Sequence, residues 1–553
     1  MIKNPILPGF HSDPSIIRVG DMYYLATSSF EWFPGIPIYR SNDLKNWQLI
    51  SHALTRKEQA ELRGVSSANG VWAPALSYDE QTQTFYIAFS IVWGFDNNNF
   101  DADNFLVTTK DIEKEWSDPI YVNSSGFDPS LFHDTNGKSF LVNLEWEFRE
   151  GYTHPGSIII QEYDKKNKKL IGDIKSISRG ATKRGCIEGP HLYKKDNYYY
   201  LITAEGGTGY GHCVAISRSS SVCGPYKPYP HNPLLTSYEE NFDELGNPNS
   251  AKPWRYAEGQ YLQKSGHGSL VETPQGEVYM VHLCSRPITK DNRSVLGRET
   301  AIQKCIWTEE HWLQLEQGGI LVSKYTKEPK IDENITKLES YPPLHGILRD
   351  DFSDGKIPLH YYTTREPIKN TWANITADNQ LELYGRGTLF GKYGQSILAR
   401  KVTGFSYTTK TKINAHPKSF LQMAGITHFY NNNNFYYLRI YFSETLGQRA
   451  LGIIESNQGQ KKEFTESRIA LKDNQWIYLK GVVQQEKLQY YYSYDNNNWE
   501  KIEPVLDISI LSDEYAGGFT GSLVGMTAQD LQNHTWSCLF DFFEYENTAT
   551  ERE

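Results

Sequence analysis

The stretch "SDPSI" at residues 12–16 decides the fold, because a similar phrase, "FDPSL", returns at residues 127–131. An aspartate followed by proline, a small residue and apolar residues is typical of a loop that turns into a buried strand. A wider version of the pattern places a small or polar residue before a large apolar one, just after Pro or Gly. It begins at Ser15, Ala75, Ser130, His191 and Ser269.

These five positions recur at intervals of 55 to 78 residues, and each interval holds three or four strand candidates. Four-stranded units repeated at such a period are typical of propeller blades. The alternative is chance recurrence in an all-β chain, but a similar apolar strand follows each position. We therefore predict a five-bladed β-propeller over residues 1–321. Helical signals are sparse, with candidates only at residues 56–64 and 237–246.

A second domain is expected after a polar, proline-bearing segment at residues 322–346, which reads as a linker. Residues 347–553 again show short alternating strands separated by Asn- and Gly-containing turns, for example "FYYLRIYF" and "QWIYLKGVV". This pattern predicts a C-terminal β-sandwich.

Composition narrows the possible functions. The 553 residues carry a formal net charge of −10, which argues against a nucleic-acid partner. The six cysteines are scattered and form no CxxC pair, so we expect neither a zinc site nor a disulfide framework. The N-terminus lacks the apolar run of a secretory signal, and no stretch of 18 apolar residues could span a membrane. A cytoplasmic protein without membrane partners is the expectation.

Three of the blade starts carry carboxylates: Asp13, Asp128 and Glu188. The first strand of each propeller blade lines the central channel, so these distant residues should meet in one cavity. Cleavage of a glycosidic bond needs one carboxylic acid to protonate the leaving oxygen and one carboxylate to act on the anomeric carbon or its water. A third carboxylate would raise the pKa of the acid. Taken singly, each motif is an ordinary turn element.

Longer motifs carry a resemblance to a known family. The chain resembles glycoside hydrolase family 43 over nearly its whole length, and most closely its two-domain β-xylosidases, some of which have α-L-arabinofuranosidase activity. The motifs are "NPILPGFHSDPSI", "YYLATSSFEWFPGIPIYRSNDLKNW", "GVWAPAL", "GFDPSLFHD", "EGPHLYK", "GHGSLVETPQGE", "LGRETAIQ" and "GGFTGSLVGM".

The resemblance implies a five-bladed propeller and inverting, single-step hydrolysis. Asp13 would be the general base that activates water, Glu188 the general acid, and Asp128 the residue that tunes and orients that acid. An inverting enzyme separates base and acid by roughly 6.5–9.5 Å to seat the water, and we expect this separation for Asp13 and Glu188.

The resemblance also implies a set of substrate-binding residues. Arg298 would donate to sugar hydroxyls, and Phe519 would reach from the second domain over the pocket, which restricts the enzyme to terminal sugars. The aromatic and small residues expected to wall the subsites are Phe30, Trp72, Ala73 and, near the second sugar, Trp146.

The loop "GGTGYG" at residues 206–211 has dinucleotide-like spacing, but a strand-like segment follows it instead of a helix. We expect this loop, with Thr208 and the adjacent Glu205, to shape the sugar pocket.

His267, at the start of the fifth blade, is a weak metal candidate. The resemblance implies that it faces the channel and can bind Ca²⁺ or water, but calcium normally takes six to eight oxygen ligands. A hydrogen-bonded structural role is the favoured interpretation, and no cofactor is required for the chemistry.

The sequence therefore predicts an exo-acting β-1,4-xylosidase that releases D-xylose from xylooligosaccharides. An α-L-arabinofuranosidase or a bifunctional enzyme is the nearest alternative. A propeller that binds carbohydrate without catalysis, and a retaining fructosidase-like enzyme, belong to other classes. Homo-oligomers are common in the resembled group, and we expect one here.

Overall fold

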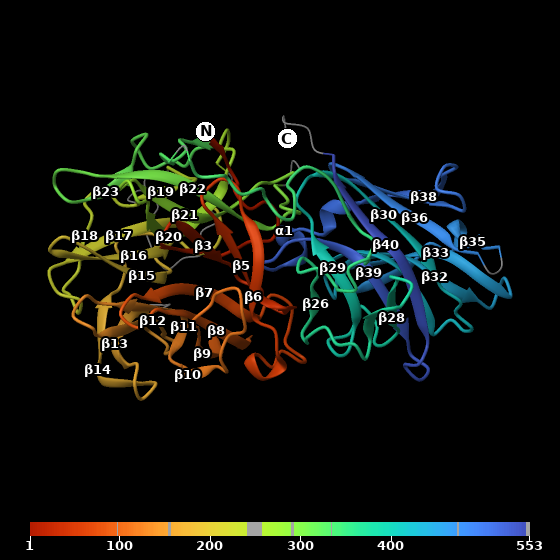
Figure 1. Cartoon of the computed structure of the whole chain (residues 1–553), viewed down its shortest axis with the longest axis horizontal. Coiled ribbons are helices and arrows are strands. Elements are labelled where there is room, and N and C mark those ends of the chain that lie inside the picture. The colour runs from red at the N-terminus through yellow and green to blue at the C-terminus, as the bar shows by residue number, and fades with distance from the viewer. Residues whose placement is uncertain are drawn as a thin grey trace.

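The computed structural model describes residues 1–96, 98–152, 156–239, 257–288, 292–332, 334–472 and 475–548. Its N-terminal part confirms the predicted five-bladed β-propeller, with five antiparallel sheets whose strands pair in chain order. This part lies beside the C-terminal domain in Figure 1. The blades are β2 (Ser15–Val19), β3 (Met22–Ala26), β5 (Gly35–Ser41) and β6 (Gln48–Leu54); β7 (Gly70–Asp79), β8 (Thr84–Asp96), β9 (Asn99–Thr109) and β10 (Ile120–Asn123); β11 (Gly126–His133), β12 (Ser139–Trp146), β13 (Gly156–Asp164) and β14 (Lys169–Ser178); β15 (Glu188–Lys195), β16 (Tyr198–Glu205), β17 (Cys213–Ser219) and β18 (Lys227–Pro228), with β19 (Leu235–Thr236) also paired to β17; and β20 (Gln263–Glu272), β21 (Val278–Ser285), β22 (Arg298–Trp307) and β23 (Leu313–Leu315).

The innermost strands form the ring around the channel. Strand β2 contacts both β7 and β20, so the first blade meets the second and the last. All five residues that begin the sequence repeat lie on these innermost strands. The repeat therefore marks the strands nearest the axis.

The N-terminal segment closes this ring. Strand β1 (Ile2–Lys3) pairs with β24 (Tyr325–Thr326), which lies within the segment predicted as linker. Asn4 is fully buried; its Nδ2 donates to the carbonyl oxygens of Ile302 and Ser323, and its Oδ1 accepts from the amide of Ile302. The start of the chain is thus tied to the fifth blade and to the segment that leaves it.

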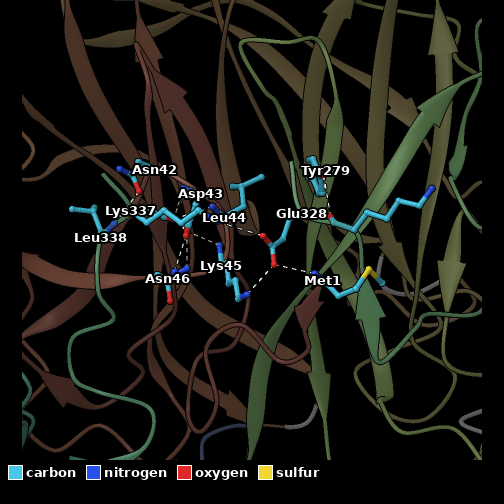
Figure 2. Close-up of polar contacts among 12 residues, drawn as sticks. Met1, Asn42, Asp43, Leu44, Lys45, Asn46, Tyr279, Glu328, Lys337 and Leu338 are labelled. Atoms are coloured by element: carbon cyan, nitrogen blue, oxygen red, sulfur yellow. Dashed lines mark hydrogen bonds and ion pairs between the residues drawn. The ribbon is translucent and has the colours of Figure 1, made fainter. Parts of the chain in front are cut away.

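A cluster of charges lies at the same closure (Figure 2). The Glu328 carboxylate pairs with the Met1 amino group at 2.9 Å, with Lys45 of the first blade at 2.8 Å and with Lys337 at 3.5 Å. The neighbouring ammonium groups lower the pKa of Glu328 to about 2. Because the groups are partly exposed, each pair contributes at most about 1 kcal/mol.

The C-terminal part confirms the predicted β-sandwich, with two antiparallel sheets that enclose a large apolar core. In β30 (Ser406–Asn414) buried and half-buried residues alternate strictly, as expected for a strand with one face in the core. The same sheet contains β25 (Gly346–Asp350), β27 (Ala373–Ile375), β28 (Leu381–Tyr384), β36 (Ile477–Gln484), β37 (Lys487–Ser493), β38 (Glu500–Asp507) and β40 (Ser537–Asn547). The other sheet contains β29 (Ser396–Lys401), β31 (Gln422–Asn431), β32 (Asn434–Ser443), β33 (Gln448–Asn457), β34 (Gln460–Glu463), β35 (Ile469–Ala470) and β39 (Leu523–Asp530).

The two domains share backbone pairing and an apolar cluster. Strand β4 (Trp32–Phe33) of the propeller pairs with β26 (Thr363–Thr364) of the sandwich. Phe10, Phe30 and Trp32 are buried against side chains of the second sheet, with the Trp32 and Phe429 rings 5.7 Å apart. Burial of such large rings favours a fixed docking of the domains.

The helix predicted at residues 56–64 is not present, because only a 3₁₀ turn, η1 (Lys57–Gln59), forms there. So short a helix is marginally stable. The Gln59 side chain donates hydrogen bonds to the backbone carbonyl oxygens of residues 116 and 117. Most of the second candidate, residues 237–246, lies outside the described residues. Among the described residues, none forms a helix long and apolar enough to cross a membrane.

Asn4 provides a test of ring closure. Asn4→Ala should lower the free energy of unfolding by about 2–3 kcal/mol, because buried backbone groups of Ile302 and Ser323 lose their partner. The midpoint of denaturant unfolding measures this change. Asn136→Ala, in an exposed turn, is the matched control and should change stability by less than about 0.5 kcal/mol. Equal effects of the two substitutions would show that the N-terminal segment does not close the ring.

Candidate active site

One cavity lies at the mouth of the propeller channel and draws residues from all five blades and the sandwich. It brings together ten of the residues predicted from sequence and two that were missed. The lining residues are Asp13, Phe30, Trp72, Ala73, Phe127, Asp128, Glu188, Thr208, His212, His267, Arg298 and Phe519.

A shared backbone feature marks the start of each blade. The residue before the Pro or Gly of each repeat has a left-handed φ, between 42° and 55°. In four blades the strand register also shifts at or beside this residue, which is the mark of a β-bulge. Left-handed conformations of residues other than glycine are uncommon and gather at functional sites. The five residues are Asp13, Ala73, Asp128, Gly189 and His267.

The fourth blade differs from the others by one position. Its left-handed residue is Gly189, whereas the carboxylate belongs to Glu188, one residue earlier. A Cβ on Gly189 would lie 3.1 Å from the His267 ring, so the close approach of the two blades favours glycine. The amide of Gly189 donates to Oδ2 of Asp128 at 2.9 Å. This bond joins the third and fourth blades beside Glu188.

Asp13 is held by hydrogen bonds from two serine hydroxyls. Its Oδ2 accepts hydrogen bonds from the hydroxyls of Ser28 at 2.6 Å and Ser12 at 3.0 Å. Ser28 in turn accepts from the amide of Ala73, so its hydroxyl hydrogen is directed to Asp13. The other oxygen, Oδ1, lies 3.7 Å from Nδ1 of His267.

Glu188 and Asp128 lie in a setting that suits bound protons. Desolvation, and then the charge of Asp13, raise the pKa of Glu188 from 4.5 to about 8, and Arg298 opposes the shift. Desolvation followed by the charges of Glu188 and Asp13 raises the pKa of Asp128 well above its usual value. A buried set of three carboxylates cannot be fully ionised at neutral pH. The site thus pairs a protonated carboxyl, able to donate, with the hydroxyl-solvated Asp13.

The walls of the cavity are aromatic and come from both domains. The Phe519 ring of the sandwich lies 5.8 Å from the Trp72 ring and 6.4 Å from the Phe30 ring. Phe127, missed in the sequence analysis, lies 5.8 Å from Trp72 on the other side. It directly precedes Asp128 in "FDPSL", and this adjacency was the available signal. Flat apolar walls beside fixed polar groups suit a sugar ring.

His212 is the second residue missed from sequence. Its ring Nδ1 lies 3.1 Å from the carbonyl oxygen of Lys264 and donates to it, which leaves a lone pair on Nε2. Among the described residues Nε2 has no hydrogen-bond partner. Burial lowers the pKa of His212, so the ring is neutral and can accept a hydrogen bond from a ligand hydroxyl. No sequence motif signalled this role.

Two predicted residues do not line the cavity. Glu205 is fully buried, and its carboxylate accepts hydrogen bonds from the amides of Ala181 and Thr182, so it holds that loop instead of facing a sugar. Trp146 packs behind the wall, with its ring 5.9 Å from Phe127 and its Nε1 donating to the carbonyl of Asn98. Its contact with a second sugar stays a prediction.

Calcium binding at His267 stays a prediction, because the described residues supply no cluster of protein ligands there. Within that part of the chain there is no group of three or more His, Cys, Asp or Glu side chains that could hold a metal ion. The nearest charged partner of His267 is Asp13, and the next ring along the channel, His191, lies 6.5 Å away. Asp13 and His267 together offer far fewer oxygen ligands than the six to eight that calcium normally takes.

Comparison with known proteins agrees with both domains. Residues 2–313 match the model for glycosyl hydrolases family 43, and residues 349–546 match the beta xylosidase C-terminal Concanavalin A-like domain. A beta-xylosidase of Bacillus subtilis (strain 168) is 39% identical, with 98% of this chain and 99% of the relative covered. A xylosidase/arabinosidase 43B of Humicola insolens is also 39% identical, with 98% and 97% covered. The crystal structure of a xylan beta-1,4-xylosidase from Bacillus halodurans C-125 superposes with a TM-score of 0.91 at 42% identity, covering 99% of this chain and 100% of the other.

The protonation of Glu188 makes a prediction about stability. Because its folded-state pKa is raised, the folded protein binds this proton more tightly than the unfolded chain, and stability from this group falls as pH rises from about 4.5 to about 8. Glu188→Gln mimics the protonated form, so it should raise the melting temperature at pH 8 by a few degrees and flatten this pH dependence.

Glu205→Gln is the matched control for that measurement. Glu205 is also buried, but its carboxylate accepts hydrogen bonds from two backbone amides. In Glu205→Gln the side-chain NH2 group would face one of these N–H donors, and that hydrogen bond would be lost. This substitution should lower the melting temperature. If Glu188→Gln were destabilising to the same degree at pH 8, Glu188 would be ionised in the folded protein.

Proposed function

The chain belongs to glycosyl hydrolases family 43, and on this premise we propose that it is an exo-acting, inverting β-1,4-xylosidase. It releases D-xylose from the non-reducing ends of xylooligosaccharides. The observation that carries the proposal is the raised pKa of Glu188 beside Asp13 and Asp128, in a cavity walled by Trp72 and Phe519. The relatives named beta-xylosidase support the substrate class.

In the proposed reaction Glu188 is the general acid and Asp13 the general base. Asp13 takes a proton from a water molecule as that water attacks the anomeric carbon. The bond from this carbon to the glycosidic oxygen breaks, and the Glu188 proton passes to the leaving oxygen. One displacement inverts the anomeric centre. Asp13 then loses its proton to solvent and Glu188 regains one.

Asp128 is proposed to hold the acid in place. It accepts the amide hydrogen of Gly189, the residue that follows Glu188. Arg298 is proposed to bind sugar hydroxyls, and Phe519 to close the end of the pocket so that only a terminal sugar enters. Because one small cavity receives the sugar, cleavage inside a long chain is disfavoured.

An α-L-arabinofuranosidase, or one enzyme with both activities, is the second candidate. The observation that favours it is the relative named xylosidase/arabinosidase, which is as similar to this chain as the beta-xylosidase is. A propeller that only binds carbohydrate gains nothing from a carboxyl kept protonated at neutral pH, so the raised pKa of Glu188 argues against that class.

The proposal also covers the setting of the enzyme. No cofactor is needed for acid–base hydrolysis. All six cysteines are free, which fits a reducing, cytoplasmic compartment where imported xylooligosaccharides from xylan degradation would be trimmed. A homo-oligomer remains part of the proposal.

Proton NMR of the first products tests the proposal. With xylobiose, the first-formed xylose from the non-reducing end should be the α-anomer, because inversion converts a β-linkage into an α-product. An arabinoside measured in parallel gives the ratio of the two activities. β-Xylose as the first product would establish retention, and turnover of the arabinoside alone would assign the second candidate.

The acid and base roles can be separated by the leaving group. Glu188→Gln should lower kcat on xylobiose by about 10²–10⁴-fold, and far less on 2,4-dinitrophenyl β-D-xyloside, whose leaving group needs no proton. Asp13→Asn should impair both substrates by a similar factor, because both need an activated water. Equal impairment of both substrates by Glu188→Gln would contradict its assignment as the acid.

A further inference from the structure

Arg298 is a propeller residue whose surroundings come largely from the sandwich. It is 5% exposed, and its amide donates to the carbonyl oxygen of Thr520 at 3.1 Å. Its guanidinium carbon lies 4.6 Å from the centre of the Phe519 ring. Its Nε lies 3.6 Å from Oδ2 of Asp513. Three sandwich residues therefore surround the group that faces the sugar.

Asp513 is itself fixed from the sandwich side. It is the first residue of α1 (Asp513–Ala516), is 6% exposed, and its Oδ1 accepts a hydrogen bond from the Tyr430 hydroxyl at 2.6 Å. Oδ2 has no hydrogen-bond partner among the described residues and is the oxygen that approaches Arg298. One oxygen of the carboxylate is thus anchored to the sandwich, and the other is directed to the propeller.

The neighbouring acid of α1 has a different partner. Glu514 forms an ion pair with Lys264 and accepts hydrogen bonds from the amide and hydroxyl of Ser294. Asp513 is consequently the acid that faces Arg298. Glu514 instead ties α1 to Ser294, four residues before Arg298 in the chain. Glu514 therefore docks the helix, and Asp513 contacts the arginine.

The backbones at this junction allow little relative movement. A Cβ on Gly297 would lie 1.6 Å from the carbonyl oxygen of Thr520, and one on Gly521 would lie 2.5 Å from that of Leu296. Only glycine permits such an approach. The position of Asp513 relative to Arg298 is therefore set by tight backbone contact between the domains.

The terminal nitrogens of Arg298 remain for the ligand. Within the described residues, no hydrogen bond from the Arg298 side chain to the protein is formed, and Nε is the nitrogen that is buried without a partner. A guanidinium held at Nε presents Nη1 and Nη2 as a fork that spans two oxygens. Without the Asp513 carboxyl group 3.6 Å from Nε, the fork could rotate away from the sugar.

We infer that Asp513 of the sandwich is a positioning residue, which holds Arg298 so that its fork binds adjacent hydroxyls of the terminal sugar. This inference rests on the proposed function for the nature of the sugar. It makes the second domain part of the binding machinery through a carboxyl group, in addition to the apolar contact of Phe519.

A double-mutant cycle tests the inference with 2,4-dinitrophenyl β-D-xyloside as substrate. Asp513→Asn should lower kcat/KM about tenfold in the native background, and less than about twofold when Arg298→Met is also present, because the asparagine then has no arginine to misplace. A role confined to folding would give equal factors in both backgrounds. Equal factors, or a folded Asp513→Asn with native kcat/KM, would overturn the inference.

Glu514→Gln is the matched control, since it alters the adjacent acid of the same helix. Its effect should be independent of Arg298→Met. If Asp513→Asn does not fold, Tyr430→Phe removes the hydroxyl that bonds to Asp513 and also to Thr520. We expect Tyr430→Phe to lower kcat/KM about threefold in the native background and to have no effect in the Arg298→Met background.

Failure of the inference is distinguishable from failure of the proposed function. If the native protein hydrolysed no xyloside, the function would be wrong. The same four proteins of the cycle would then be compared by a different measurement. That measurement is the rise in melting temperature caused by added D-xylose and, separately, by L-arabinose. For a sugar that raises the native melting temperature, that rise should shrink on Asp513→Asn only when Arg298 is present. If neither sugar raised the native melting temperature, the inference would fall with the function.

Discussion

Three carboxylates share one desolvated cavity, and they cannot all be ionised there. Asp13 has two hydroxyl donors at one oxygen, whereas desolvation and the charge of Asp13 raise the pKa of Glu188 to about 8. Protons therefore stay on Glu188 and Asp128, beside the hydroxyl-bonded Asp13. The proposed acid, Glu188, and the proposed base, Asp13, can therefore act at the same pH, as single-step hydrolysis requires.

The propeller makes this arrangement possible because it brings blade starts together from distant parts of the chain. A left-handed residue before each Pro or Gly marks the innermost strand, and in four blades the side chain of that residue lines the cavity. The N-terminal segment holds the ring closed through Asn4 and β1. Closure matters because Asp13 lies on the first blade and contacts His267 of the last.

Much of the fold was predictable from the sequence, since the loop-to-strand repeat reports local backbone geometry. The three carboxylates followed from the same repeat, because equivalent positions converge on one axis. Roles set by long-range docking were not predictable. Asp513 and His212 carry no local pattern, and Glu205 looked like a pocket residue only because its loop lies near the pocket in sequence. The helix predicted at residues 56–64 failed because tertiary contacts of Gln59 outweigh a weak local preference.

The protonation state of Glu188 in the free protein at neutral pH tests the account most directly. Carbon-13 NMR of protein labelled at the glutamate δ-carboxyl, with the Glu188 signal assigned by its loss in Glu188→Gln, reports that state as pH is varied. The account predicts a signal that remains protonated at pH 7 and titrates at lower pH once Asp13 is replaced by asparagine. A Glu188 carboxyl already ionised at pH 7, and unaffected by the loss of the Asp13 charge, would contradict it.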